Sequence, residues 1–389
     1  YDLAARWIRE AQRVVVKVGS GGRQAGPELA LLLERAGGVL VHTPIATGCI
    51  PYAHPQNMTI GGSKGSLCGN YAMEQADLLI AAGTRAVCQS DSSRTGYPNV
   101  KRVININADP YDATHYNHTL ALVGNVPHTL DVLNQALGLP TVDKQAWLAA
   151  CAEKKAAWEA FKAERWANPV LPDDYWGGEV LTQPAAIKIA TDWAKARGAP
   201  CFFDAGDVQA NGFQIVEDER PDQTFTETGA SYMGFAVSAL LATGVAARPF
   251  YALALTGDGS FTMNPQILID GVEHGARGCI LLLDNGRMSA ITGLQEAQYG
   301  AGFATWNTLH VDYLAWGRAV PGLLALDGGR TPQALAVALE QAGQHPGLSL
   351  IHVPVYYGPD PLGGMGVYGR WNVGNWCDEV QALRHAIGL

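Results

Sequence analysis

The sequence predicts an α/β protein with two doubly wound parallel-sheet domains joined by a helical linker. Two stretches, residues 13–108 and 201–353, each contain four short, nearly continuous apolar segments separated by helical segments. Such runs are typical of parallel strands that are buried on both faces, because the crossover helices cover the sheet. The length of 389 residues allows two or three domains at about 150 residues each, which agrees with two such sheets.

The first domain is assigned to residues 1–138 and is expected to be Rossmann-like. Its first strand is rich in valine, a β-branched residue that favours strands, and it ends in a glycine-rich turn. The expected strands are residues 13–18, 39–42, 77–83 and 103–108, and a helix is expected over residues 28–36.

Residues 139–177 are expected to form the helical linker. Within them, residues 141–169 are more polar than their surroundings and have a helical pattern that stops at Pro169, which cannot continue a helix. The apolar positions do not keep a heptad repeat, so a coiled coil is not predicted.

The second domain is assigned to residues 178–389 and includes a C-terminal tail. The expected strands are residues 201–204, 251–256, 279–283 and 348–353, and the expected helices are residues 183–196, 234–243 and 264–274. The tail, residues 358–376, is rich in Gly, Tyr and Trp, and a final helix is expected from residue 378.

The composition disfavours several classes of protein. A formal net charge of −9 argues against binding to the phosphate backbone of nucleic acids. We expect neither a membrane span nor a signal peptide, because no apolar run is long enough and the first residues lack the necessary pattern. The seven cysteines are scattered and include no CxxC pair, which favours reduced thiols in a cytoplasmic protein.

Two compositional features concern surfaces and turns. Charged residues make up 16% of the chain, against roughly 25% in ordinary soluble domains. We therefore expect other chains to cover much of the surface. Glycine accounts for 45 residues, which indicates tight turns and close approach of the backbone to ligands.

The strongest chemical signal is the turn Gly257-Asp258-Gly259, between an apolar strand and a helix. Asn285 ends the next apolar strand, 27 positions after Asp258. If the two strands are neighbours, both side chains lie at the carboxyl edge of the sheet, where open α/β sheets bind ligands. A carboxylate, an amide oxygen and a nearby carbonyl suit Mg²⁺ bound together with phosphate. The two glycines allow a diphosphate to approach, and the following helix N-terminus favours an anion.

This turn and spacing resemble the signature of thiamine-diphosphate-dependent enzymes. A Gly-Asp-Gly triplet alone is an ordinary turn, but here the preceding strand, the following helix and Asn285 accompany it. The resemblance implies that Mg²⁺ is held by Asp258, Asn285 and the main-chain oxygen of Arg287. It also implies that Ser260 and the two glycines lie beside the diphosphate.

Two upstream segments extend the resemblance. Met233 takes the place of the bulky apolar residue that holds the cofactor in its bent conformation. The Ser231 carbonyl would then accept a hydrogen bond from the 4′-amino group of the cofactor, although the family often has glycine at this position. Gly206-Asp207-Val208 resembles a turn that contacts the diphosphate, with the Asp207 side chain expected to point away.

Residues 1–137 resemble the central domain of the same family, chiefly at residues 76–85 and 103–109. Some members hold FAD or ADP in this domain. Neither is supported by a motif here, because the glycines of residues 19–22 lack the spacing of a dinucleotide fingerprint. A narrower resemblance, to the trihydroxycyclohexane-dione hydrolases of inositol breakdown, rests on residues 51–55, 83–85, 111–113, 289–294 and, loosely, the tail at 368–376.

In this family a Glu that contacts N1′ of the aminopyrimidine activates the cofactor, and it lies on a pyrimidine-binding domain. Both α/β domains of this chain have other assignments, so no catalytic residue is identified within it. Either the pyrimidine-binding domain is a separate subunit, or the chain is a trimmed piece of a longer one. We favour the separate subunit and expect a heterotetramer.

The resemblance implies a subunit of a thiamine-diphosphate- and Mg²⁺-dependent enzyme that cleaves a C–C bond of a small carbonyl substrate, hydrolysing a cyclic 1,2-diketone. Decarboxylation of a 2-oxo acid and carboligation of the acetolactate synthase type are alternatives. A non-catalytic regulatory or binding subunit is disfavoured because Asp258 and Asn285 are both present. A nicotinamide dehydrogenase is disfavoured by the weak glycine loop.

Four side chains are candidates for the substrate side of the site: Gln209, Asn211, Gln295 and Trp371. For each of them a structural role is the simpler interpretation. None of the ten histidines has a partner pattern that indicates acid–base catalysis.

Overall fold

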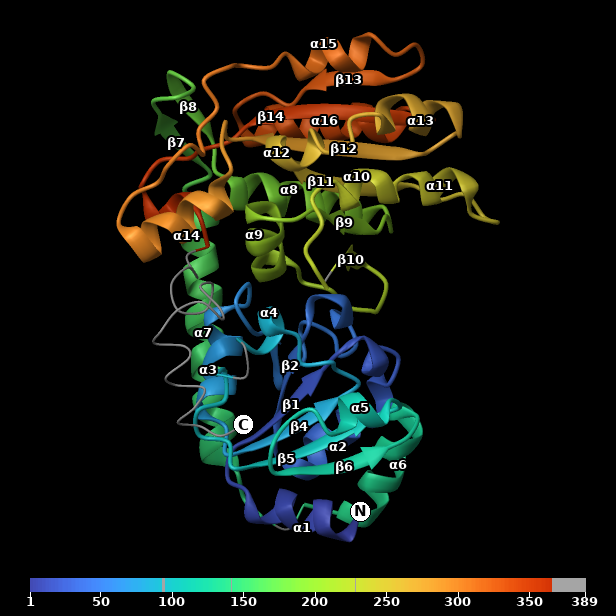
Figure 1. Cartoon of the computed structure of the whole chain (residues 1–389), viewed down its shortest axis with the longest axis vertical. Coiled ribbons are helices and arrows are strands. Elements are labelled where there is room, and N and C mark those ends of the chain that lie inside the picture. The colour runs from blue at the N-terminus through green and yellow to red at the C-terminus, as the bar shows by residue number, and fades with distance from the viewer. Residues whose placement is uncertain (93–94, 141, 228, 366–389) are drawn as a thin grey trace. The chain divides into compact units, whose positions relative to one another are not determined.

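The computed structural model of the chain describes residues 1–92, 95–140, 142–227 and 229–365 (Figure 1). These residues form two compact α/β units, which confirms the predicted fold class. The first unit comprises Tyr1–Ala160 and Glu217–Asp222, and the second comprises Phe161–Val216 and the chain from Gln223 to Met365. The predicted final helix and the end of the predicted tail, including Trp371, lie outside the described residues.

The first unit is built on a six-stranded parallel sheet with the strand order β3-β2-β1-β4-β5-β6. The strands are β1 (Val14–Val18), β2 (Val39–His42), β3 (Asn57–Ile60), β4 (Leu78–Ala82), β5 (Arg102–Asn107) and β6 (Thr119–Val123). The four inner strands correspond to the four predicted ones. The two edge strands, β3 and β6, were not predicted.

Helices cover both faces of this sheet (Figure 1). They are α1 (Asp2–Glu10), α2 (Gly26–Ala36), α3 (Leu67–Gln75), α4 (Cys88–Asp91), α5 (Pro110–Ala113) and α6 (Val126–Leu137). On one face, α1 and α2 both pack against α6. The fully buried side chains of Leu29, Leu33 and Leu130 meet those of Val14 and Val16 there, and this apolar cluster forms the core.

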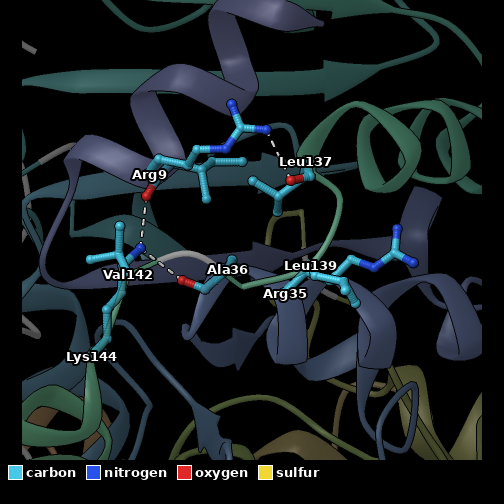
Figure 2. A pocket seen from close by; sticks show the side chains of 8 residues that line it. Arg9, Arg35, Ala36, Leu137, Leu139, Val142 and Lys144 are labelled. Carbon is cyan, nitrogen blue, oxygen red and sulfur yellow. Dashed lines mark hydrogen bonds between the residues drawn. The ribbon is translucent and has the colours of Figure 1, made fainter.

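Three basic side chains surround a small pocket in the first unit (Figure 2). Lys144 Nζ donates to the carbonyl oxygens of Ile8 at 2.7 Å and Ala36 at 2.8 Å. Arg9 donates at 2.9 Å to the carbonyls of the last two residues of α6, and Arg35 bonds to another carbonyl in the last turn of that helix. The carbonyl oxygens at the ends of α1, α2 and α6 are thus satisfied by cations, which helix C-termini favour.

The loops after β1 and β4 touch at the point where the strand order reverses. The Gly19 N–H donates to the Ala82 carbonyl and the Gly21 N–H donates to the Gly83 carbonyl, each at 3.0 Å. A Cβ atom on Gly19 would lie 2.5 Å from the Gly83 carbonyl oxygen and 2.6 Å from Thr84 Cα. Glycine is therefore required at position 19 by the close approach of two backbones.

Lys17 is a buried lysine within β1, with 1% of its surface exposed. Its Nζ donates to the carbonyl oxygens of Ser90 at 2.7 Å and Gly61 at 3.1 Å. Burial lowers the pKa of Lys17 from 10.5 to about 7, and the Asp91 carboxylate partly opposes this shift. Met73 Sδ, a weak acceptor, also lies 3.9 Å from Nζ.

In chain order, a long helix and then a hairpin follow the strands of the first sheet and precede those of the second. Helix α7 (Gln145–Ala167) begins in the first unit and ends in the second. Strands β7 (Val170–Asp173) and β8 (Gly178–Leu181) follow and pair in antiparallel fashion. The predicted helical segment is confirmed within a few residues, but the end of the expected linker is β-structure.

The second unit has a six-stranded parallel sheet with the strand order β10-β9-β11-β12-β14-β13. The strands are β9 (Cys201–Phe203), β10 (Thr224–Thr226), β11 (Ala252–Gly257), β12 (Gly278–Asp284), β13 (Leu324–Asp327) and β14 (Leu348–Pro354). The inner strands again correspond to the predicted ones, and the edge strands β10 and β13 were missed.

The helices of the second unit also lie on both faces of its sheet (Figure 1). They are α8 (Gln183–Ala196), α9 (Asp207–Ile215), α10 (Phe235–Ala239), α11 (Leu241–Val245), α12 (Asp258–Phe261), α13 (Ile267–Glu273), α14 (Ser289–Tyr299), α15 (Tyr313–Arg318) and α16 (Pro332–Gln344). Helices α8 and α16 pack together, and α10, α13 and α15 contribute to a core that includes Phe261 and Tyr313.

The helix predicted over residues 234–243 is two short helices, α10 and α11. The Leu240 N–H bonds to the Val237 carbonyl, and the Thr243 N–H bonds to the Leu240 carbonyl. These bonds span three residues, so the chain tightens at Leu240. The Thr243 hydroxyl also donates to the Leu240 carbonyl at 2.6 Å, which competes with the regular helical pattern.

Replacement of Gly19 should destabilise the first unit. Gly19→Ala places a methyl group against backbone atoms that cannot rotate away, and overpacking of this kind costs about 1–3 kcal/mol of unfolding free energy. Urea unfolding monitored by circular dichroism measures the loss. Gly364→Ala is the control, because a Cβ there meets nothing within 4 Å. Equal unfolding midpoints for the two variants would contradict the close approach.

The stability contributed by Lys17 should depend on pH. Because its pKa is lower in the folded chain, the unfolded chain binds more protons between pH 7 and pH 10, and a rise in pH favours folding. Relative to Lys17→Met, the wild type should gain about 2 kcal/mol of unfolding free energy from pH 7 to pH 9. Urea denaturation of both proteins at the two pH values tests this. Parallel pH profiles would show that Lys17 stays protonated in the fold.

Candidate functional site

The predicted site residues gather at the carboxyl ends of β9, β11 and β12 in the second unit. The order of the strands reverses beside β9, with β10 on one side and β11 on the other. Open α/β sheets bind ligands at such a reversal, outside the carboxyl ends of the strands. In the register of the sheet, Gly257 pairs with Leu283, so the residues that follow them emerge at the same edge.

Asp258 is the first residue of α12, and its side chain is buried, with 3% of the residue exposed. Burial raises the pKa of its carboxyl group to about 7, and the neighbouring Asp284 carboxylate adds to the rise. The main-chain amides of Asp258, Gly259 and Asn285 donate to the carboxylate and oppose the shift. The main-chain N–H of Asn285 therefore lies near the Asp258 carboxylate.

The Asn285 side chain is held within its own loop. Its Nδ2 donates to the Ser289 hydroxyl at 2.6 Å, and its Oδ1 accepts from the Arg287 N–H at 3.2 Å. Between them, Gly286 has a φ of 68°, a conformation that glycine adopts easily. The Tyr175 ring fills the space that a Cβ on Gly286 would need.

The Arg287 side chain contacts Tyr357, outside this loop. Its guanidinium donates to the Tyr357 carbonyl and lies over the ring of the same residue. Burial lowers the pKa of Arg287 to about 10, while acidic neighbours, among them Glu296 and Asp207, oppose the shift. Only the main-chain oxygen of Arg287 enters the predicted metal site, so this role of the side chain is compatible with it.

The glycines of the motif lie beside apolar side chains. A Cβ on Gly259 would be 2.6 Å from Met288 Sδ and 3.7 Å from Met233 Cε, so Met233 reaches the motif. A Cβ on Gly257 would meet Val208 Cγ2 at 3.7 Å. The next residue of the motif, Ser260, is buried within α12.

Gly206 and Ser231 both have backbone conformations with positive φ. Gly206 has a φ of 79° and caps the N-terminus of α9, with Asp207 in the first turn of that helix. Ser231 has a φ of 59°, and its hydroxyl donates to Gln209 Oε1 at 2.8 Å. The two segments that the sequence assigns to the site are thus joined through the Gln209 side chain.

The other substrate-side candidates take part in structural hydrogen bonds. Gln209 is buried, and its Nε2 donates to the Thr226 hydroxyl at 2.6 Å. Asn211 is buried and bonds to the Gln183 side chain. Gln295 accepts a hydrogen bond from the main-chain N–H of Phe303 at 2.7 Å.

Sequence reasoning missed three groups at this edge. Asp204 accepts from the Thr256 hydroxyl at 2.9 Å and from the Gly234 N–H at 2.8 Å, which ties β9 to β11 and to the Met233 segment. Asp284 pairs with His352 Nε2 at 2.9 Å. Asn307 donates to Asp258 Oδ2 at 3.1 Å. The only local signal was an acidic residue at the end of an apolar strand.

A second metal site, built from His, Cys, Asp and Glu side chains, is not found in the parts of the chain that the structure describes. No three His, Cys, Asp or Glu side chains there are grouped so that they could hold a metal ion. The predicted site has a different composition, with one carboxylate, one amide oxygen and one main-chain carbonyl. Such a set fits Mg²⁺ when a diphosphate completes the shell.

Comparison with protein families supports both halves of the resemblance. Residues 1–133 match the thiamine pyrophosphate enzyme central domain, and residues 204–353 match the C-terminal TPP binding domain of these enzymes. The chain belongs to the thiamine pyrophosphate enzyme family. The second match contains the whole edge described above, from Asp204 to His352.

Curated relatives of this family member include two kinds of enzyme. A 3D-(3,5/4)-trihydroxycyclohexane-1,2-dione hydrolase from Listeria monocytogenes is 27% identical over 95% of this chain and 61% of its own length. The same-named protein of Bacillus velezensis is 28% identical over 90% of this chain and 58% of its own length. A probable acetolactate synthase large subunit from Methanocaldococcus jannaschii is 26% identical over 76% of this chain and 50% of its own length. The chain thus spans about three fifths of the length of these hydrolases.

Two further observations concern membrane spans and cysteines. Within the described ranges, no helix has both the length and the apolar character to cross a membrane. Cys49, Cys68, Cys151 and Cys279 are buried and carry free thiols, and Cys201 is also buried.

Proposed function

We propose that this chain is the cofactor-binding part of a thiamine-diphosphate- and Mg²⁺-dependent enzyme that cleaves a C–C bond. The observation that carries the proposal is the buried Asp258 carboxylate beside the main-chain N–H of Asn285, at the carboxyl edge where β11 and β12 pair. A buried carboxylate next to Asp284 is costly unless positive charge compensates it. A divalent cation at this edge would supply that charge.

The described residues fit both groups. Asp258, Asn285 and the main-chain oxygen of Arg287 would hold Mg²⁺. The turn at residues 206–208 and the motif at residues 257–260 would face the diphosphate, since glycine backbones and the start of a helix favour an anion. Met233, which reaches Gly259, would support the bent cofactor, and the Ser231 carbonyl would accept from its amino group.

When bound, thiamine diphosphate supplies a carbon nucleophile and an electron sink for cleavage beside a carbonyl group. The contribution of this chain would be to bind and orient the cofactor. Asp204 supports that task, because its carboxylate fixes the Gly234 amide next to Met233 and the Thr256 hydroxyl next to the motif. These contacts hold the two cofactor-binding segments on adjacent strands.

The carboxylate that activates the aminopyrimidine would come from another chain. Both α/β units of this chain match other domains of the family. We favour a pyrimidine-binding domain on a separate subunit in a heterotetramer, and a pyrimidine-binding domain elsewhere in a longer chain is the alternative. The proposed location is the cytoplasm, which scattered cysteines without a CxxC pair favour.

Hydrolysis of a cyclic 1,2-diketone is the proposed reaction. Relatives named as dione hydrolases align over 78% to 95% of this chain, and the probable acetolactate synthase aligns over 76%. That shorter alignment still supports carboligation, or decarboxylation of a 2-oxo acid, as the alternative. A substrate panel with a cyclic 1,2-diketone and a 2-oxo acid would separate these activities.

Substitution of the central carboxylate should remove cofactor binding. Asp258→Ala deletes a charged metal ligand, so we expect calorimetry to show a loss of more than about tenfold in affinity for thiamine diphosphate with Mg²⁺. Glu273→Gln, an exposed acidic position on α13, is the control and should bind as the wild type does. Undiminished binding by a folded Asp258→Ala variant would refute the metal assignment.

The chain alone should be inactive toward the substrate. Without the activating carboxylate, we expect the purified chain to release no product from a cyclic 1,2-diketone when supplied with cofactor and Mg²⁺. Activity should appear when a subunit that carries a pyrimidine-binding domain is added. Measurable turnover by the single chain would contradict the separate subunit.

A further inference from the structure

The proposed metal ligands follow two different strands, and one residue outside the motif contacts both groups. Asp258 follows β11, whereas Asn285 and Arg287 follow β12. Asn307, in the loop between α14 and α15, donates its main-chain N–H to the Gly286 carbonyl at 2.8 Å. Its Nδ2 donates to Asp258 Oδ2 at 3.1 Å.

The main chain at this position is fixed independently of the side chain. Arg287 and Trp306 form an isolated antiparallel bridge, and the Met288 N–H donates to the Thr305 carbonyl at 2.9 Å. With the bond from Asn307 to the Gly286 carbonyl, these contacts hold the segment against the loop that carries Asn285. Backbone hydrogen bonds thereby help to place the carboxamide of residue 307 beside Asp258.

The Asn307 carboxamide is one of several hydrogen-bond donors to the Asp258 carboxylate. The carboxylate accepts from main-chain amides that belong to its own helix and to the β12 loop. Asn307 adds a side-chain donor at Oδ2, which limits rotation of the carboxylate. A ligand held by neighbouring hydrogen bonds binds its metal more tightly, because less orientational freedom is lost.

We propose that Asn307 is a positioning residue for the divalent cation, and this inference rests on the proposed function of the edge. It sets the orientation of Asp258 and, through the Gly286 carbonyl, fixes the loop that leads to the Arg287 oxygen. Asn307 lies on an exposed loop, so the loss of its carboxamide should cost little folding free energy. Its effect on the metal is therefore separable from an effect on the fold.

The test measures metal binding by the full chain saturated with thiamine diphosphate, with Mn²⁺ as the probe and electron paramagnetic resonance as the readout of free metal. Asn307→Leu removes the carboxamide donor and keeps the main-chain N–H. Asn307→Gln keeps the donor on a longer side chain. Asn168→Leu is the matched control, because Asn168 is exposed and donates to the Glu164 carbonyl of α7.

Asn307→Leu should weaken Mn²⁺ binding by about 10-fold or more, the size seen when partners of metal ligands are removed. Asn307→Gln should recover part of the affinity, and Asn168→Leu should match the wild type. The thermal unfolding midpoints without metal should stay equal. Wild-type affinity in Asn307→Leu, together with lost affinity in Asp258→Ala, would overturn this inference alone. Wild-type affinity in both variants would overturn the proposed metal site itself.

Discussion

Burial of the Asp258 carboxylate is the constraint on which the edge of the second sheet depends. Taking a charge out of water is costly unless hydrogen bonds and an opposite charge compensate it. Main-chain amides from two elements and the Asn307 carboxamide provide the hydrogen bonds. The buried Asp258 carboxylate still lacks a compensating positive charge. The proposed cation, bound together with the diphosphate, would supply it.

Neighbouring carboxylates secure the loops around that edge in the same way. Asp204 directly follows β9 and accepts from groups on β11 and on the Met233 segment. Asp284 ends β12 and pairs with His352 on β14. Each carboxylate joins elements that are far apart in the sequence, so the loops that would contact the cofactor are held by the strands beneath them.

The inner strands of both sheets could be predicted, and the edge strands could not. Strands such as β12 are buried along their whole length and appear in the sequence as unbroken apolar runs. Strands β6 and β13 are mostly half-buried, so their patterns do not differ from those of loops. The other two edge strands, β3 and β10, contain Asn or Thr residues that interrupt the apolar pattern. The turn at Leu240 was missed for another reason. A hydrogen bond from the Thr243 side chain to the Leu240 carbonyl interrupts a segment whose sequence has a helical pattern.

The site was predictable where the signal was local. Asp258 and Asn285 each end a predicted strand, and the register of the sheet brings them together. Asn307 and His352 have no local signal, because their contacts arise only when the loop after α14 and strand β14 are in place. Gln209 could be placed near the site from sequence, but its buried hydrogen bonds to Thr226 and Ser231 could not.

The most direct test of the account is a crystal structure of the chain grown with thiamine diphosphate and Mn²⁺, with anomalous scattering used to locate the metal. The account predicts one metal ion bound by Asp258, Asn285 and the main-chain oxygen of Arg287, with the diphosphate beside Gly257 and Gly259. A metal ion held by other residues, or a cofactor bound away from the carboxyl ends of β9 and β11, would contradict it.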